Sequence, residues 1–288
     1  MNKTFPTVGI IADGRTAGMF MSPAISLGIE LHCFDSKEEI HSSAAKCDVV
    51  TIADTSTSSA IAKRLEADGV TVRPSFSAIS EASDKFNSAM NQTHQICVMV
   101  ARSPHGQATT WTPTEILRSN AKWVMSISPA PQLSAAMQEK AQKLAMVFAA
   151  QLGAVGVIAV EMSVKDEDLS VVSVKMSPHD SGNWTIDGSV TTQYEQHLRA
   201  ILDLPLGDPS MSALYVVTGN FYCGEKPNMY RPYLHLMART PALKFHQYKN
   251  SDAPGELMGH ITLAGDDLPK IIEEIEHALQ YLQGEVDE

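Results

Sequence analysis

The sequence has few cysteines and lacks long apolar runs. Its 288 residues include four cysteines, none in a CxxC pair: Cys33, Cys47, Cys97 and Cys223. This scatter argues against a disulfide framework or a zinc site and predicts buried thiols in a reducing compartment. No apolar stretch reaches the roughly 18 residues that a membrane-spanning helix needs. The opening segment MNKTFPTVGIIAD shows no apolar signal core. We therefore expect a cytoplasmic protein with no membrane partner.

Positive charge is also scarce. The chain carries 22 Lys and Arg against 33 Asp and Glu, a formal net charge of −11. Nucleic acid and anionic membranes attract basic surfaces, so this balance disfavours both as partners. Hydrophobic residues make up 44% of the sequence, enough for a substantial buried core.

The first part of the chain alternates strands and helices. Apolar stretches over 7–13, 30–35, 48–54 and 70–75 predict strands, and helical segments follow the first of them (to about residue 27) and the third (58–69). Such alternation is typical of parallel βαβ units, in which ligands bind at the carboxyl ends of the strands.

The turn after the first strand allows a different interpretation. Residues 12–17, ADGRTA, resemble a dinucleotide-binding turn, and Asp35 follows at the usual distance for a ribose contact. A nucleotide-cofactor oxidoreductase is therefore one alternative function. Against it, Ala12 stands where the tight turn needs glycine, and Asp13 and Arg15 would crowd a pyrophosphate. A purely structural turn explains the same residues.

The remaining chain predicts mainly antiparallel structure. After a helix over 75–92, the strands 96–103, 107–117 and 122–128 form a meander whose first turn is Pro104-His105-Gly106. A helix follows over 133–153, with an expected apolar face at Met137, Ala141, Leu144, Phe148 and Leu152. Next comes a hairpin that turns at 165–168. The last helix has an apolar stripe that predicts a core contact: Leu268, Ile271, Ile272, Ile275, Leu279 and Leu282.

Glu161 interrupts an apolar strand of that hairpin. A buried carboxylate needs a partner, either a cation or a metal. The returning strand carries Ser173 and Lys175 but no second acid. One carboxylate is a weak magnesium site, because such sites generally use one or two carboxylates plus phosphate oxygens. An ion pair between Glu161 and Lys175 across the hairpin is the alternative.

The segment SVKMSPHDSGNWTIDGSVTTQYEQHLRAILDLPLG is similar to the signature of the N5-carboxyaminoimidazole ribonucleotide synthetases. These are ATP-grasp enzymes of purine biosynthesis, also known as the ATPase subunit of phosphoribosylaminoimidazole carboxylase. The resemblance extends over ADGRTAGM, VARSPHGQAT, SPAPQLS, GVIAVEM and MGHITLAG, and so over almost the whole chain.

The resemblance implies an α/β fold in three parts. Residues 1–92 would form a Rossmann-like parallel domain that precedes the ATP-grasp domain. Residues 93–230 would form the ATP-grasp C subdomain with a mixed or antiparallel sheet, and 231–288 a small C-terminal α/β segment. The family's lid subdomain, which clamps ATP, would be absent, because only Thr93-His94-Gln95 joins the two matching flanks.

Other departures fall on residues that the resemblance associates with the site. The family's first metal carboxylate corresponds to Glu161, but the second corresponds to Ser173. A family arginine corresponds to Ser177, and the glutamine of the first turn corresponds to Arg15. What remains of the substrate pocket would comprise the following residues: Gly14, Arg15, His179, Asp180, Ser181, Gly182, Gln193, His197, Gly259 and His260. Each of these residues could equally have a structural role, satisfying buried backbone groups or fixing a loop.

The sequence thus predicts a degenerate relative without ATPase or carboxylation activity, acting by binding or assembly and needing no cofactor. The alternative is an active enzyme that uses Mg-ATP to carboxylate 5-aminoimidazole ribonucleotide. The resemblance also implies a homodimer, with a purine-pathway enzyme as a further possible partner. We expect apolar residues of the meander to form the dimer contact: Ile96, Val98, Val100, Trp111 and Trp123.

Overall fold

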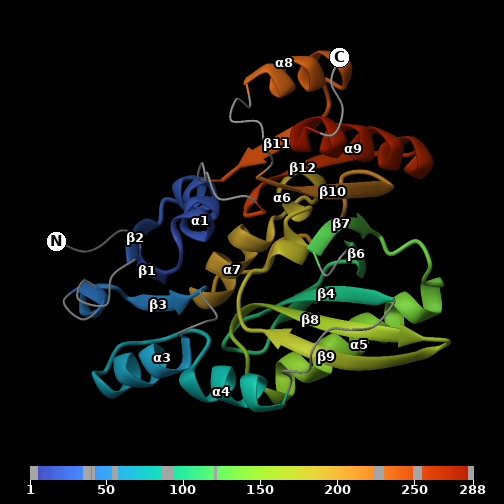
Figure 1. The fold of residues 1–288 in the computed structure, drawn as a ribbon. Coiled ribbons are helices and arrows are strands. Elements are labelled where there is room, and N and C mark those ends of the chain that lie inside the picture. The colour runs from blue at the N-terminus through green and yellow to red at the C-terminus, as the bar shows by residue number, and fades with distance from the viewer. Residues whose placement is uncertain are drawn as a thin grey trace.

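A computed structural model describes residues 6–34, 40, 43–53, 58–85, 94–119, 122–223, 230–248 and 255–284. A small parallel sheet opens the chain, with strand order β2-β1-β3. Its strands are β1 (Thr7–Ile11), β2 (Glu30–Phe34) and β3 (Val49–Ile52), and the helices α1 (Gly14–Leu27) and α3 (Ser58–Ala67) accompany it. The predicted βαβ units are confirmed (Figure 1).

The predicted fourth strand over 70–75 is wrong. Only an isolated parallel bridge joins Val72 to Val50. Pro74 follows two residues later and has no N–H to continue a ladder, so the pairing stops there. The chain then enters α4 (Phe76–Lys85), and the rest of the helix expected over 75–92 lies outside the described residues.

A large antiparallel sheet forms the body of the molecule, with the order β11-β12-β10-β7-β6-β4-β8-β9 and β5 paired to β4. Its strands have these bounds: β4 (Gln95–Arg102), β5 (Ala108–Thr110), β6 (Thr114–Ser119), β7 (Lys122–Ser128), β8 (Gly156–Lys165), β9 (Asp168–Lys175), β10 (Tyr215–Tyr222), β11 (Lys244–Gln247) and β12 (Leu257–Gly265). The strand predicted over 107–117 is split in two, because Pro113 cannot donate to a ladder.

Helices pack on this sheet. They are α5 (Ala135–Gln151), α6 (Thr185–Gly188), α7 (Gln193–Ile201), α8 (Tyr230–Arg239) and α9 (Leu268–Gln283), with 3-10 turns η1 (Ala44–Lys46) and η2 (Asp180–Gly182). The apolar stripe of α9 is buried as predicted at Ile271, Ile275, Leu279 and Leu282. The predicted apolar face of α5 is buried at Ala141 and Leu152, and Met137 and Leu144 pack against the same core. Its most buried residues also include Ala145 and Ala149, whose small side chains suit close approach to the sheet.

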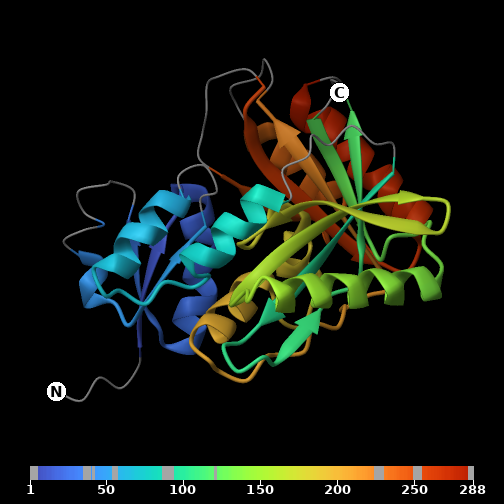
Figure 2. The same ribbon diagram turned by 90° about the horizontal axis from the view of Figure 1, so that it is seen from below.

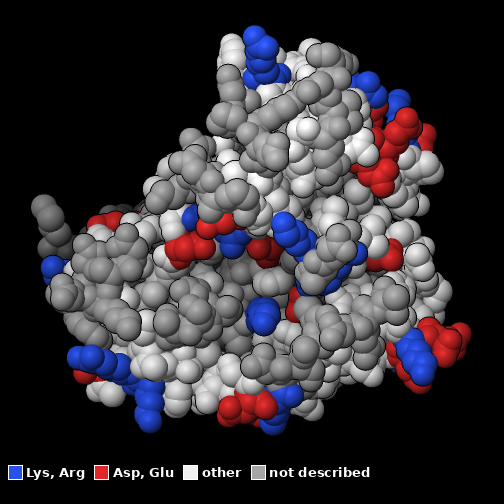
Figure 3. Space-filling model, in the orientation of Figure 1, with Lys and Arg blue, Asp and Glu red and all other residues white. Residues whose placement is uncertain are grey.

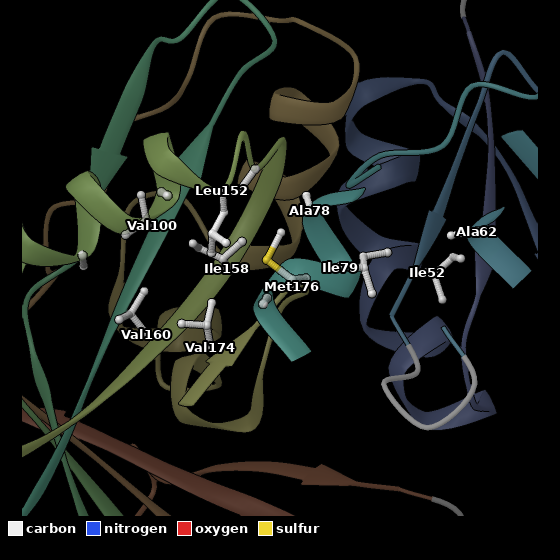
Figure 4. Packing of buried hydrophobic residues seen from close by; sticks show 14 of the residues in the cluster. Ile52, Ala62, Ala78, Ile79, Val100, Leu152, Ile158, Val160, Val174 and Met176 are labelled. Atoms are coloured by element: carbon white, nitrogen blue, oxygen red, sulfur yellow. The ribbon is translucent and has the colours of Figure 1, made fainter. Parts of the chain in front are cut away.

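One buried cluster spans both sheets. It includes Ile52 and Ala62 beside the small sheet, Ile79 on α4, and Val100 and Ile158 in the large sheet (Figure 4). The view in Figure 2 shows α4 lying between the two sheets. The core is therefore continuous across the boundary that we predicted at residue 92. None of the described helices is long and apolar enough to cross a membrane.

The predicted dimer patch is wrong. Ile96, Val98, Val100 and Trp111 are all buried inside the subunit. Three of them face the helices that cover the sheet, and Trp111 donates from its indole nitrogen to Ser189 Oγ at 3.1 Å. The side chain of Trp123 lies outside the described residues. The four described residues stabilise the core and offer no surface to a partner.

Candidate functional site

The carboxyl end of β1 and the loop after β9 meet at a small cavity of about 200 Å³. Its lining comes from distant parts of the sequence: Asp13, Arg15, Thr16, Ala53, Ser177, Pro178, His179, Asp180 and Tyr194. Asp13 caps α1, accepting from the backbone N–H of Thr16 at 2.7 Å, and Gly14 is the first residue of that helix. The cavity thus brings together Arg15, His179 and Asp180 of the predicted pocket, with Ser177 and Asp13 beside them.

Arg15 is held by acidic and aromatic neighbours. Its Nη1 lies 3.3 Å from Asp180 Oδ2, and its Nε lies 3.8 Å from Asp13 Oδ2. The guanidinium also lies over the Tyr248 ring, 5.1 Å from the ring centre. Burial lowers the pKa of Arg15, but Asp180, Tyr248 and Asp13 outweigh it, so the pKa is raised overall. The charge is therefore retained and is shared between two carboxylates.

Gln193 fixes the shape of the loop. Its Oε1 accepts from the N–H of His179 at 2.9 Å, and its Nε2 donates to the carbonyl of His179 at 2.9 Å and to Asn183 Oδ1 at 3.1 Å. A Cβ on Gly182 would lie 2.5 Å from Gln193 Oε1, so a larger residue there would displace the Gln193 amide from these hydrogen bonds. Ser181 is buried and donates to Cys97 Sγ at 3.1 Å. The polar groups of this loop are used to hold its own conformation.

His197 lies behind the cavity and joins three elements. Its Nδ1 accepts from the backbone N–H of Val157 on β8 at 2.9 Å, and its Nε2 lies 2.8 Å from Thr51 Oγ1 on β3. Complete burial lowers the pKa of His197 to about 3. The ring is therefore neutral, with its proton on Nε2, because Nδ1 must accept. This geometry gives His197 the backbone-satisfying role that the sequence left open.

His260 belongs to an aromatic network that reaches the cavity through Tyr248. Its Nδ1 lies 2.6 Å from Tyr248 Oη, and its ring stacks on His246 at 4.5 Å between ring centres. Burial, followed by the charges of His246 and Arg15, lowers the pKa of His260, and its buried Nε2 has no hydrogen-bond partner within the described residues. Gly259 precedes it on β12, where a Cβ would lie 2.4 Å from the His246 carbonyl.

Several members of this network were missed in the sequence. Tyr248 also lies 3.3 Å from Asn183 Nδ2, and His246 Nε2 lies 2.7 Å from Asp187 Oδ2. Tyr194 donates to Asn183 Oδ1 at 3.0 Å. Asp187 and Tyr194 stand within the matched segment, so their positions could have been found. His246 and Tyr248 lie beyond it, with no pattern that marks them.

Glu161 lies apart from this cavity, on the hairpin of β8 and β9. Its cross-strand partner is Ser173. The two residues are 2% and 4% exposed, and the hydroxyl of Ser173 has no hydrogen-bond partner in the described part of the chain. Lys175 lies opposite Ala159 and, within the described chain, makes no ion pair with Glu161. The predicted ion pair is therefore wrong, because the register places the lysine two pairs further along the hairpin.

The residues around Glu161 do not fit a magnesium ion. On the other side of Glu161, β4 places Cys97 as its cross-strand partner. Burial, and then the nearby charge of Glu161, raises the pKa of the Cys97 thiol. Magnesium requires near-octahedral oxygen coordination, whereas this site offers one closed-off carboxylate, a hydroxyl and a neutral thiol. In the part of the chain that the structure describes, no group of three or more His, Cys, Asp or Glu could hold a metal.

The surface seen in Figure 3 carries small, mixed groups of basic and acidic side chains. On this face they form no continuous basic stripe of the kind that binds nucleic acid. The candidate site residues described above lie in two places, the cavity beside Arg15 and the closed hairpin beside Glu161.

Known ATP-grasp proteins are similar to this chain in sequence and in fold. The ATP-grasp domain family matches residues 76–194. The N5-carboxyaminoimidazole ribonucleotide synthetase of Thermus thermophilus has a similar fold, with a TM-score of 0.81 at 22% identity over 98% of this chain and 99% of that one. The Aspergillus clavatus N5-carboxyaminoimidazole synthase, solved with ADP and 5-aminoimidazole ribonucleotide, gives 0.85 at 20% identity over 96% and 98%.

Curated proteins similar in sequence to this chain belong to one group of synthases. The N5-carboxyaminoimidazole ribonucleotide synthase of Mycobacterium tuberculosis is 39% identical over 192 residues, which are 65% of this chain and 45% of that protein. The Escherichia coli K12 protein of the same name is 28% identical over 68% of this chain and 53% of its own length. The chain is thus a homologue of these synthases, as the signature indicated. It spans about half the length of the curated relatives it matches.

Proposed function

We propose that the chain is a non-catalytic relative of the N5-carboxyaminoimidazole ribonucleotide synthases, which keeps the scaffold and acts by binding or assembly. The observation that carries this proposal is the Glu161–Ser173 pair. The resemblance assigns both positions to metal carboxylates, yet one is a serine and both are closed to solvent. Without the metal, the charge on a transferring phosphoryl group has no counter-ion at this hairpin.

The cavity beside Arg15 supports the same proposal. Asp180 and Asp13 already neutralise the guanidinium, and Ser177 stands where the resemblance expects an arginine. A charge-assisted hydrogen bond contributes about 1.5–3 kcal/mol. Losing two or three of them is large against the roughly 8 kcal/mol of a micromolar complex. We therefore expect phosphorylated ligands to bind weakly here.

The connection between α4 and β4 supports it as well. Nine residues, 86–94, separate Lys85 from Gln95. The resemblance expects a whole lid subdomain at this point, and nine residues are too few to form one. Phosphoryl transfer relies on positioned charges in a site shielded from water. A chain without the lid lacks one wall of that site.

We expect no ATP hydrolysis by the purified chain. The measurement is phosphate release at millimolar Mg-ATP, with and without 5-aminoimidazole ribonucleotide and bicarbonate. The Escherichia coli synthase under the same conditions is the positive control. Calorimetric titration with Mg-ATP and with NAD separates binding from turnover. A rate of about 1–10² per second would overturn the proposal and support the active ATP-dependent carboxylating enzyme instead.

We also expect a homodimer, on the strength of the resemblance. The exposed face of α8 is a candidate contact, because Tyr230, Leu234 and Met237 are large, exposed and spaced as i, i+4 and i+7. Light scattering across a wide concentration range should give twice the chain mass. The Leu234→Glu substitution should lower the measured mass toward that of a single chain. Leu214→Glu, at an exposed leucine elsewhere, should leave the mass unchanged. A single-chain mass throughout would exclude the dimer.

A further inference from the structure

Two histidines from different helices face each other at the C-terminal end of the fold. Nε2 of His235 on α8 lies 3.4 Å from Nε2 of His277 on α9. The ring of His235 stacks on Tyr281 at 4.3 Å between ring centres, with 17° between the planes. The stacking restrains the plane of the His235 ring.

The same helix pair is held together beside the histidines. Glu274 on α9 accepts from Arg239 Nε at 3.1 Å and from Thr240 Oγ1 at 2.8 Å. These contacts fix the end of α8 against α9 independently of the imidazoles. The two rings are therefore brought together by the fold before anything binds between them.

The separation of the two nitrogens is at the long end for a hydrogen bond and is also compatible with two ligands on one metal ion. Hydrogen bonds from nitrogen mostly span about 2.7–3.2 Å. Zinc binds histidine nitrogen at about 2.0–2.1 Å with tetrahedral angles, which places two ligand nitrogens about 3.3–3.4 Å apart. The observed 3.4 Å agrees with this spacing.

We propose that His235 and His277 form a binding site for a zinc-class transition-metal ion, which clips α8 to α9. Within the described chain no third His, Cys, Asp or Glu completes the group, so the two imidazoles are the ligands on which the proposal rests. The site is therefore expected to be weaker than a four-ligand structural zinc site. Magnesium, which prefers oxygen ligands, would not bind there. The proposal does not depend on the Glu161 hairpin.

Calorimetric titration of the full chain with ZnCl₂ at pH 7.5 tests the site. We expect one ion per chain and, at ten times the dissociation constant, a rise in Tm of about 3 °C. MgCl₂ should give neither effect. Lowering the pH to 5.5 should weaken zinc binding, because a ligating imidazole must be unprotonated.

Substitutions of the two histidines test whether they are the ligands of the ion. His277→Gln and His235→Gln should each abolish both effects. His105→Gln should keep them, because His105 is an exposed histidine paired with Asp203 elsewhere on the surface. The Tm of each variant without metal shows whether it folds, and Co²⁺ absorption reports nitrogen ligation directly. Zinc binding that persists unchanged in both folded variants, or no binding at about 1 mM zinc, would overturn the proposal.

Discussion

Replacing His197 with alanine is expected to lower the free energy of unfolding by about 3–5 kcal/mol. The substitution leaves the buried N–H of Val157 and the hydroxyl of Thr51 without their partner. It also opens a cavity beside Gly156, whose added Cβ would lie 2.7 Å from the His197 ring. Urea unfolding followed by circular dichroism measures the change.

The matched control is His105→Ala, which removes an exposed imidazole and should cost less than about 0.5 kcal/mol. The pH dependence provides a second check. The pKa of His197 is about 3 in the folded chain and about 6.5 when unfolded. Between these values the unfolded chain binds more protons, so stability falls by up to about 1.4 kcal/mol per unit as pH decreases. His197→Ala should lose this part of the slope, and a loss under about 1 kcal/mol at pH 8 would contradict the bridging role.

The double substitution Ser173→Glu with Ser177→Arg is expected to restore no ATP hydrolysis. It returns the second carboxylate and the arginine that the resemblance implies, but not the lid. At pH 8 the new carboxylate would be buried opposite Glu161, so we expect a loss of stability of about 3 kcal/mol. Added Mg²⁺ should recover part of this loss, which would reveal weak metal binding. Phosphate release and thermal unfolding with and without Mg²⁺ are the measurements.

The control for charge is Ser173→Gln with Ser177→Arg, which adds similar volume without a second carboxylate. In the glutamate variant, repulsion between the two acids should raise the pKa of one of them above its unfolded value. Its stability should therefore be retained at low pH and lost as the pH rises. The glutamine variant should lack this dependence. ATP hydrolysis by the Ser173→Glu, Ser177→Arg variant would show that the lid is dispensable and that residues 173 and 177 alone account for the inactivity.

The local order of strands and helices could be predicted because their signals are local. Alternation of strand and helix defined the small sheet, and the i, i+3, i+4 stripe identified the buried face of α9. Proline limited the predictions at 74 and 113, where a missing N–H ended pairing that the apolar pattern alone would continue. The uninterrupted apolar run of β4 predicted a surface for a partner subunit. The strand is instead buried on both faces, where continuous apolar runs are typical.

The site was only partly predictable because its contacts are long-range. The motif placed His179 and Asp180 in one loop, but Arg15 is 165 residues from Asp180 in sequence. Nothing local shows that the two charges neutralise each other. The register of β8 and β9, shifted by a bulge after Glu161, likewise decides that Ser173 rather than Lys175 faces Glu161. The sequence alone determines neither the contact between Arg15 and Asp180 nor the pairing of Glu161 with Ser173.

The position of His197 has a consequence for how the molecule folds. One ring connects β3 of the small sheet to β8 of the large one, and Arg73 donates to the carbonyl of Ile201 nearby. Because the buried core crosses the same boundary, we expect the two sheets to depend on each other for stability and to unfold as one cooperative unit. The residues that make these hydrogen bonds and core contacts all lie outside the 86–94 connection. A subdomain can thus be gained or lost at that connection during evolution while the cooperative unit stays intact.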